Sequence, residues 1–108
     1  MSKEITIRAS IFSDELTRAA SLYLLGAFGG FYATEGDGGY KFMNGQTEMT
    51  RAVSWQIGTA AKDSERFAHV SAFARLYCSA GSQESIYFLD SDGAVYLVNA
   101  NGRIDPIV

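Results

Sequence analysis

The chain has 108 residues, of which 47% are hydrophobic and 19% are charged, and its net charge is −3. A chain of this length and composition can bury its own core, so we expect one folded domain over residues 1–108 rather than a disordered segment. The nine basic residues are scattered along the chain and form no run, which argues against a nucleic-acid-binding surface. No apolar stretch approaches the ~20 residues that a membrane-spanning helix needs.

The cysteine content indicates a reducing compartment. Cys78 is the only cysteine, so an intramolecular disulfide cannot form. The first residues, Met-Ser-Lys-Glu-Ile-Thr, lack the apolar stretch of a secretion signal. We therefore expect a cytoplasmic protein that does not contact a membrane.

The chain begins with a predicted strand and a predicted helix. Residues 4–12 alternate between apolar and polar side chains, which is typical of a strand with one wet face. Ser13 is well placed to cap a helix that runs to about Phe28 and ends at Gly29.

The glycine-rich segment that follows predicts a hairpin. Phe31–Thr34 and Tyr40–Met43 have the composition of short strands, and Glu35–Gly39 between them reads as the turn. A glycine-rich loop can bind phosphate where it leads into a helix. Here it leads into an expected strand, so we interpret it as a hairpin tip.

The second half of the chain predicts two more helices and three strands. Thr47–Ala61 is predicted to be helical with a core stripe of Met49, Val53, Ile57 and Ala60. A third helix is expected over Glu65–Ser79, capped by Asp63 or Ser64. The strands, separated by Asp-Gly and Asn-Gly turns, are Ser85–Asp90, Ala94–Asn99 and Arg103–Ile107. Because Pro106 cannot donate a backbone hydrogen bond, the last strand should lie at a sheet edge.

The element order β-α-β-β-α-α-β-β-β predicts an α+β fold. We expect a mostly antiparallel sheet with three helices packed on it, ending in a C-terminal three-stranded meander. Within the meander, Ile86 and Phe88 face one way, and Tyr87 and Leu89 face the other. A sheet with two apolar faces needs two covers, so we expect a homodimer or a stable complex with another protein.

The sequence predicts no catalytic, cofactor-binding or metal-binding set. Cys78 and His69 lie nine positions apart on one predicted helix, which places them on opposite faces. We expect Cys78 to be an inert core thiol and His69 to lie on the surface beside Glu65. A single cysteine and a single histidine cannot build a structural zinc site. Asp90–Gly93 resembles the start of a calcium loop, but Asn101 stands where that loop needs a bidentate glutamate.

Trp55 is the residue that the sequence favours as the centre of a contact surface. On the predicted helix it lies opposite the core stripe, and tryptophan and arginine are enriched in binding hot spots. The alternative is that Gly26–Phe31 covers Trp55, because large aromatic residues are usually buried. The predicted partner-binding residues are Trp55, Arg51 and Thr59 on the helix and Glu35, Asp37 and Tyr40 at the hairpin.

These observations favour a small non-enzymatic protein-binding module without a cofactor. Proteins of this type include phage and mobile-element inhibitors of host defence that block a host protein complex. Two alternatives stay open. One is a small-molecule-binding domain whose pocket is lined by Trp55, Tyr40 and Tyr32. The other is an enzyme of unfamiliar type that uses scattered carboxylates.

Overall fold

The structure of the protein is a computed structural model, and it describes residues 3–41, 43–59 and 62–107. In chain order its elements are β1 (Lys3–Ser10), α1 (Asp14–Phe28), β2 (Tyr32–Lys41), β3 (Thr47–Thr59), α2 (Asp63–Gly81), β4 (Ser85–Leu89), β5 (Val95–Asn99) and β6 (Ile104–Pro106). Neither described helix is long and apolar enough to cross a membrane.

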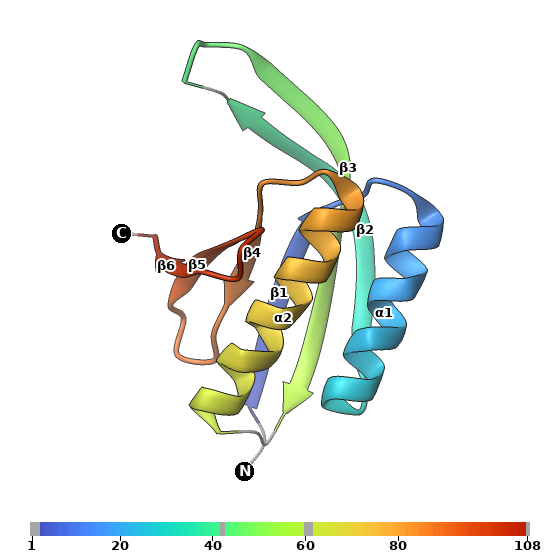
Figure 1. Cartoon of the computed structure of the whole chain (residues 1–108), viewed down its shortest axis with the longest axis vertical. Helices are drawn as coiled ribbons and strands as arrows, with labels where there is room; N and C mark the ends of the chain where they lie inside the picture. Colours follow the sequence, from blue (N-terminus) through green and yellow to red (C-terminus); the bar gives the residue numbers. More distant parts are fainter. Residues whose placement is uncertain (1–2, 42, 60–61, 108) are drawn as a thin grey trace.

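The six strands form one antiparallel sheet in the order β2-β3-β1-β4-β5-β6. The units β1-α1-β2 and β3-α2-β4 interleave, so β1 lies between β3 and β4. Both helices lie on the same face of the sheet and contact each other (Figure 1). The α+β class is therefore confirmed, but the described residues form two helices, not the three that were predicted.

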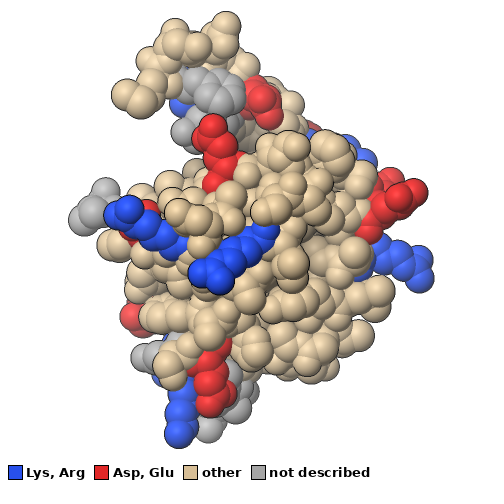
Figure 2. Space-filling view, in the orientation of Figure 1, with Lys and Arg blue, Asp and Glu red and all other residues tan. Residues whose placement is uncertain are grey.

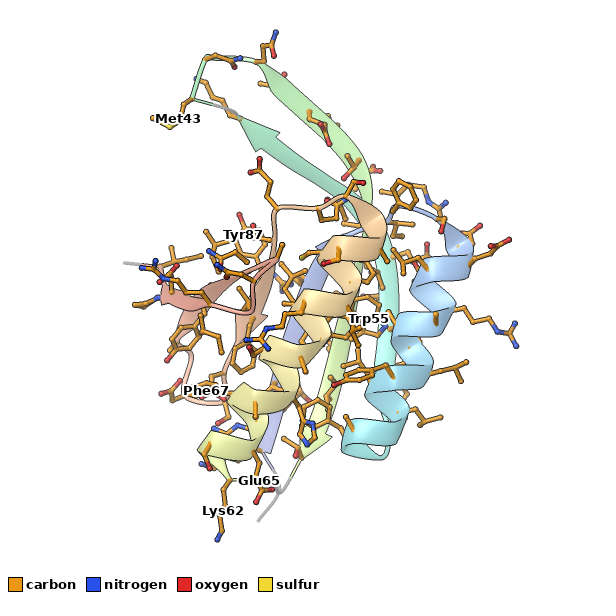
Figure 3. The ribbon with its side chains drawn as sticks, viewed as in Figure 1. Met43, Trp55, Lys62, Glu65, Phe67 and Tyr87 are labelled. Carbon is orange, nitrogen blue, oxygen red and sulfur yellow. The ribbon has the colours of Figure 1, made fainter. Side chains whose placement is uncertain are left out.

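The core lies between the sheet and the helices, and Trp55 is at its centre. Trp55 is 0% exposed, and its indole N–H donates to Ser21 Oγ at 2.9 Å. Its ring makes edge contacts with Phe73 and Tyr77 of α2, and Figure 3 shows it behind the two helices. The alternating apolar residues of β1 face the same core, as their spacing predicted.

The predicted helix over residues 47–61 is wrong, because residues 47–59 form β3. Val53, Trp55 and Ile57 are buried and alternate with exposed or half-buried residues, which is the period of a strand. Met49, expected in the core, is 78% exposed. Ala60, also expected in the core stripe, lies outside the described residues. Val53 and Ile57 are four residues apart, a spacing that places two side chains on one face of either a helix or a strand. The apolar spacing at these positions therefore did not distinguish a helix from a strand.

The predicted turn over Glu35–Gly39 is also wrong. These residues lie within β2, which pairs with β3 over its whole length. None of the glycines of β2 has a positive φ, whereas Gly45, beyond the end of β2, has a φ of 89°. The chain therefore turns near Gly45, and the distal part of the β2–β3 hairpin projects beyond the rest of the sheet (Figure 1).

The three C-terminal strands begin and end within one residue of the predicted ranges. They pair consecutively and antiparallel, with β6 and its Pro106 at the sheet edge. They extend the same sheet that β1 to β3 form, so this part of the chain is not a separate meander.

Candidate functional site

The face of the sheet opposite the helices carries a groove. It has a volume of about 740 Å³, within the range typical of small-molecule sites. We call it the open-face groove. Its lining residues are Arg8, Ala9, Ser10, Asp37, Gly38, Gly39, Glu48, Thr50, Ala52, Ser82, Gln83, Glu84, Ser85, Tyr87, Leu89, Val95 and Leu97.

One side of the groove is a row of large side chains that crosses three strands. Arg8 of β1 lies directly opposite Tyr87 of β4, and Tyr87 lies opposite Leu97 of β5. Residues opposite each other on neighbouring strands share a face, so their side chains lie next to one another. Tyr87 is 42% exposed, which leaves much of its ring open to a ligand. This row offers a flat aromatic and aliphatic wall with a guanidinium at one end.

The floor next to this wall is built from small residues. Ser10 of β1 lies opposite Ala52 of β3, and Thr50 of β3 lies opposite Gly38 of β2. The Thr50 hydroxyl donates to Ser10 Oγ at 3.2 Å. Small side chains let a ligand approach the sheet closely, and the hydroxyls can accept or donate hydrogen bonds to it.

The floor is held in place by a hydrogen bond from α2, on the opposite side of the sheet, and by a backbone hydrogen bond between the end of β1 and β3. The Tyr77 hydroxyl of α2 donates to the backbone carbonyl of Ser10 at 2.5 Å, and the backbone N–H of Ile11 donates to the carbonyl of Arg51 at 2.8 Å. The loop after α2 forms another border. There Ser82 has a φ of 54°, and the carbonyl of Glu84 accepts from the N–H of Ala100 at 3.0 Å. The groove is therefore attached to both the helix layer and the C-terminal strands.

The charged residues of the lining are not paired with one another. Arg8 is the one cation of the described lining, and Glu48 and Glu84 are acidic residues of it; Asp37 also borders the groove, but its position on β2 is a helix-side one. The ion pairs of the described residues involve none of these four side chains. A groove that holds unpaired charges of both signs, with an excess of negative charge, suits a ligand with an excess of positive charge.

The structure contradicts the prediction that Trp55 is the centre of a contact surface. Trp55 and Thr59 lie on β3 and are buried, so neither can meet a partner in this fold. Arg51 is exposed, but it bridges Glu35 at 2.6 Å and Asp14 at 3.5 Å. Its hydrogen bond and charge interaction with Glu35 raise the pKa of Arg51. The physical reason for the error is the assignment of residues 47–61 to a helix, which placed Trp55 on a solvent face.

The hairpin residues of the prediction all lie on β2. Glu35 and Asp37 are two positions apart and lie on the helix-bearing side of β2, where Glu35 pairs with Arg51. Asp37 also borders the open-face groove. Tyr40 lies in β2, and its side chain is outside the description. The predicted pocket of Trp55, Tyr40 and Tyr32 is not formed, because Trp55 is in the core. Tyr32 instead lines a more open hollow with residues 28–31, Gln56 and Gly58.

The remaining titratable candidates do not form a reactive set. Burial raises the pKa of the Cys78 thiol to about 11, and the His69 ring packs edge-on against Phe28. Asp90, considered for calcium, is buried and accepts two hydrogen bonds from the Arg66 guanidinium, at 3.1 and 3.2 Å. Among the described residues no group of histidine, cysteine, aspartate and glutamate side chains could hold a metal ion.

Sequence reasoning missed Arg8 and Tyr87 as site residues. A signal for Tyr87 was present, since the strand that contains it is apolar on both faces. No signal for Arg8 was present in the sequence, because its role depends on the pairing of β1 with β4, which are far apart in the chain.

The face of the molecule drawn in Figure 2 carries charges of both signs. In the view of Figure 2, lysine and arginine side chains are interspersed with aspartate and glutamate. The basic residues in this view gather into no stripe that could follow a phosphate backbone.

Comparison with known proteins identifies relatives of the fold alone. No protein-family model matches the sequence, and no curated protein matches it. Two solved structures resemble the chain. A phage SAM lyase in complex with S-methyl-5'-thioadenosine has a TM-score of 0.63 at 14% identity, covering 99% of this chain and 89% of the lyase chain. A phage SAM lyase in the apo state has a TM-score of 0.60 at 14% identity, covering 98% of this chain and 85% of the other.

These similarities correct the functional prediction made from the sequence. The non-enzymatic protein-binding module was wrong, because the solved structures that share the fold over almost the whole chain are those of an enzyme. The predictions of a homodimer and of a protein partner are not tested by the comparison. The chain thus has the α+β fold of the phage SAM lyase structures.

Proposed function

We propose that this protein is an enzyme that cleaves S-adenosylmethionine and that it binds this substrate in the open-face groove. The observation that carries the proposal is the combination of the shared fold with a groove whose unpaired charges suit this molecule. S-adenosylmethionine has two cationic centres, the sulfonium and the ammonium, and one carboxylate. Its net positive charge complements a lining with one cation, Arg8, and two acidic side chains, Glu48 and Glu84.

Each part of the substrate has a chemical counterpart in the groove. The Arg8 guanidinium can bind the carboxylate through two parallel hydrogen bonds. Tyr87 and Leu97 offer a flat surface on which adenine can stack. Glu48 and Glu84 carry the negative charge that stabilises the sulfonium and the ammonium. The hydroxyls of Ser10 and Thr50 lie on the floor, where a ribose can hydrogen-bond.

The cleavage has two possible routes, which differ in the acid–base help they need from the protein. Formation of S-methyl-5'-thioadenosine breaks the bond between the sulfur and Cγ of the methionine-derived chain, and the electron pair of that bond stays on sulfur. Cγ then receives electrons in one of two ways: its own carboxylate attacks to form a lactone, or a Cβ proton leaves to form a double bond. The first route requires only that the substrate is held in a bent conformation. The second route requires a base, and the carboxylates of Glu48 and Glu84 in the lining can accept the Cβ proton.

Incubation of the purified protein with S-adenosylmethionine tests the proposal. Liquid chromatography with mass detection should show S-methyl-5'-thioadenosine together with a four-carbon fragment. The fragment's behaviour separates the routes, because a lactone opens in mild alkali with the gain of one water, whereas an unsaturated amino acid does not.

Matched variants test the location of the site. Arg8→Ala and Tyr87→Ala should each lower kcat/KM by about tenfold or more, since each removes a contact to the bound substrate. Arg18→Ala and Tyr32→Ala remove the same side-chain types from exposed positions outside the groove, and they should keep kcat/KM within about twofold. Absence of cleavage by the wild-type protein would refute the activity, and equal losses in both sets of variants would refute the location.

A further inference from the structure

The outer edge of β2 has no partner strand. β2 is the terminal strand of the sheet, and its residues 32–41 pair with β3 without a break. Among the described residues, β2 makes no backbone hydrogen bond other than those with β3. A long row of free N–H and C=O groups is a template for another strand. The opposite edge is protected, because β6 spans only Ile104–Pro106 and includes a proline.

The interior of β2 contains glycines that this chain does not require for its own backbone. Gly36, Gly38 and Gly39 have ordinary φ values rather than positive ones. A Cβ built on Gly36 meets no atom within 4 Å, and on Gly39 it meets only ordinary contacts from 3.8 Å. Only at Gly38 would it come close to a neighbour, at 3.2 Å from Ala52 Cβ. Glycine weakens a strand, and inside one it often marks the close approach of another backbone or a ligand.

The glycines occupy positions on both faces of the sheet, which favours a neighbouring strand, rather than a ligand, as the group that approaches them. Gly36 and Gly38 lie on the open face, because successive residues of a strand alternate. Gly39 lies on the helix-bearing side with its partner Met49. A ligand on one face would contact one of these sets only. A strand that adds to the edge lies close to both.

We propose that a second copy of this chain pairs with the free edge of β2, antiparallel, about a two-fold axis at Gly38. This inference uses the sheet edge and does not rest on the proposed function. The two copies then form one continuous sheet through an isologous contact.

The charges of β2 and the length of the paired segment select this register. About a two-fold axis, a residue before the axis pairs with the residue that lies equally far beyond it in the other copy. Opposite residues must also share a face of the continuous sheet, so the axis must pass through a residue rather than between two. An axis at Gly36 would place Glu35 opposite Asp37, and an axis at Asp37 would place the two copies of Asp37 opposite each other. The axis at Gly38 places Glu35 opposite Lys41 on both sides of the centre. An axis at Gly39 also places opposite charges together, Asp37 and Lys41, but it leaves only residues 37–41 paired, which is a shorter contact.

The side chains at these positions are available for the contact. Glu35 is 55% exposed and holds the Arg51 guanidinium at 2.6 Å, so the partner's Lys41 would join an existing pair. Lys41 is exposed and makes no ion pair within the described part of its own chain. Asp37 would face Gly39, and Gly38 would face Gly38, so no bulky residues oppose each other near the axis.

Charge reversal and rescue test this interface. Size-exclusion chromatography with light scattering on the full chain at about 50 μM should give twice the mass of one chain. Glu35→Lys and Lys41→Glu each place like charges opposite twice and should raise the dissociation constant by about tenfold or more. The double variant restores opposite charges and should return the dissociation constant to within about threefold of the wild type. Lys62→Glu makes the same charge change at the start of α2 and should leave the dimer unchanged.

Each outcome bears on the proposal. Far-UV circular dichroism of all variants checks that the fold is retained. Glu35→Lys also removes the ion pair between Glu35 and Arg51. If this disturbs the fold, Lys41→Glu alone tests the interface, since Lys41 makes no ion pair within the described part of its own chain. A monomeric wild type at this concentration overturns the proposal. An oligomer that neither charge reversal weakens also overturns it, because its interface then lies elsewhere. A double variant that is as monomeric as the two single variants overturns it as well.

Discussion

Replacement of Trp55 by alanine is the most direct test of the core described here. The side chain is 0% exposed, and a tryptophan buries about 150–250 Å², so its removal forfeits about 4–6 kcal/mol at about 25 cal/mol/Å². Alanine recovers a small part of this, and the neighbouring helices can partly collapse into the space. The lost indole hydrogen bond to Ser21 adds little, because the Ser21 hydroxyl still donates to the Thr17 carbonyl at 2.9 Å. We expect a loss of about 3–5 kcal/mol in the free energy of unfolding.

Urea titration followed by far-UV circular dichroism measures this loss without the tryptophan signal. For a chain of this size the midpoint of thermal unfolding should fall by about 12–20 °C. Tyr32→Ala is the matched control, because Tyr32 is 81% exposed and its removal should change the free energy by about 0.5 kcal/mol or less. The indole fluorescence of the folded wild type should be blue-shifted. A red-shifted emission together with a loss below about 1 kcal/mol would show that Trp55 is not in the core.

Further predictions concern the packing of α2 and the buried thiol. Asp90→Ala removes a buried carboxylate that accepts two hydrogen bonds from the Arg66 guanidinium and should cost about 3–5 kcal/mol, whereas the double replacement of both by leucine should cost less, as urea titration will show. Gly102→Ala should destabilise more than Gly93→Ala, although both have similar positive φ values, because only at Gly102 would a Cβ meet side chains of α2. Cys78 should react with iodoacetamide far more slowly in buffer than in denaturant at pH 8. Burial raises the pKa of its thiol from 9.0 to about 11, so the folded state holds the thiol proton more tightly than the unfolded state does. The contribution of Cys78 to stability is therefore complete below about pH 9 and declines as the pH rises toward 11.

The parts of the fold that could be predicted are those set by local signals. Alternation in residues 4–12 and the Ser13 cap define β1 and the start of α1, and Ser13 Oγ does accept from the Leu16 N–H at 3.1 Å. The C-terminal strands followed from two-residue turns with glycine, and both Gly93 and Gly102 have the positive φ that such turns require. These features depend on residues a few positions apart, so a single sequence contains the information.

The elements that could not be predicted depend on a partner strand. β2 has a composition typical of a turn, and only its pairing with β3 makes it a strand. In β3, Val53, Trp55 and Ile57 are strand formers that alternate, a signal that could have been given more weight than the helical spacing of Met49, Val53 and Ile57. The groove was beyond prediction because Arg8 and Tyr87 meet only through the sheet order.

The correction of β3 from helix to strand also explains why the open face exists. A third helix over residues 47–61 would have been available to cover a second face of the sheet. As a strand, this segment instead widens the sheet and supplies Thr50 and Ala52 to the floor of the groove. The two described helices cover one face only, so the opposite face keeps Arg8, Tyr87 and Leu97 accessible. The same segment therefore buries Trp55 on one side and builds the candidate site on the other, which is why misassigning it affected both the fold and the function.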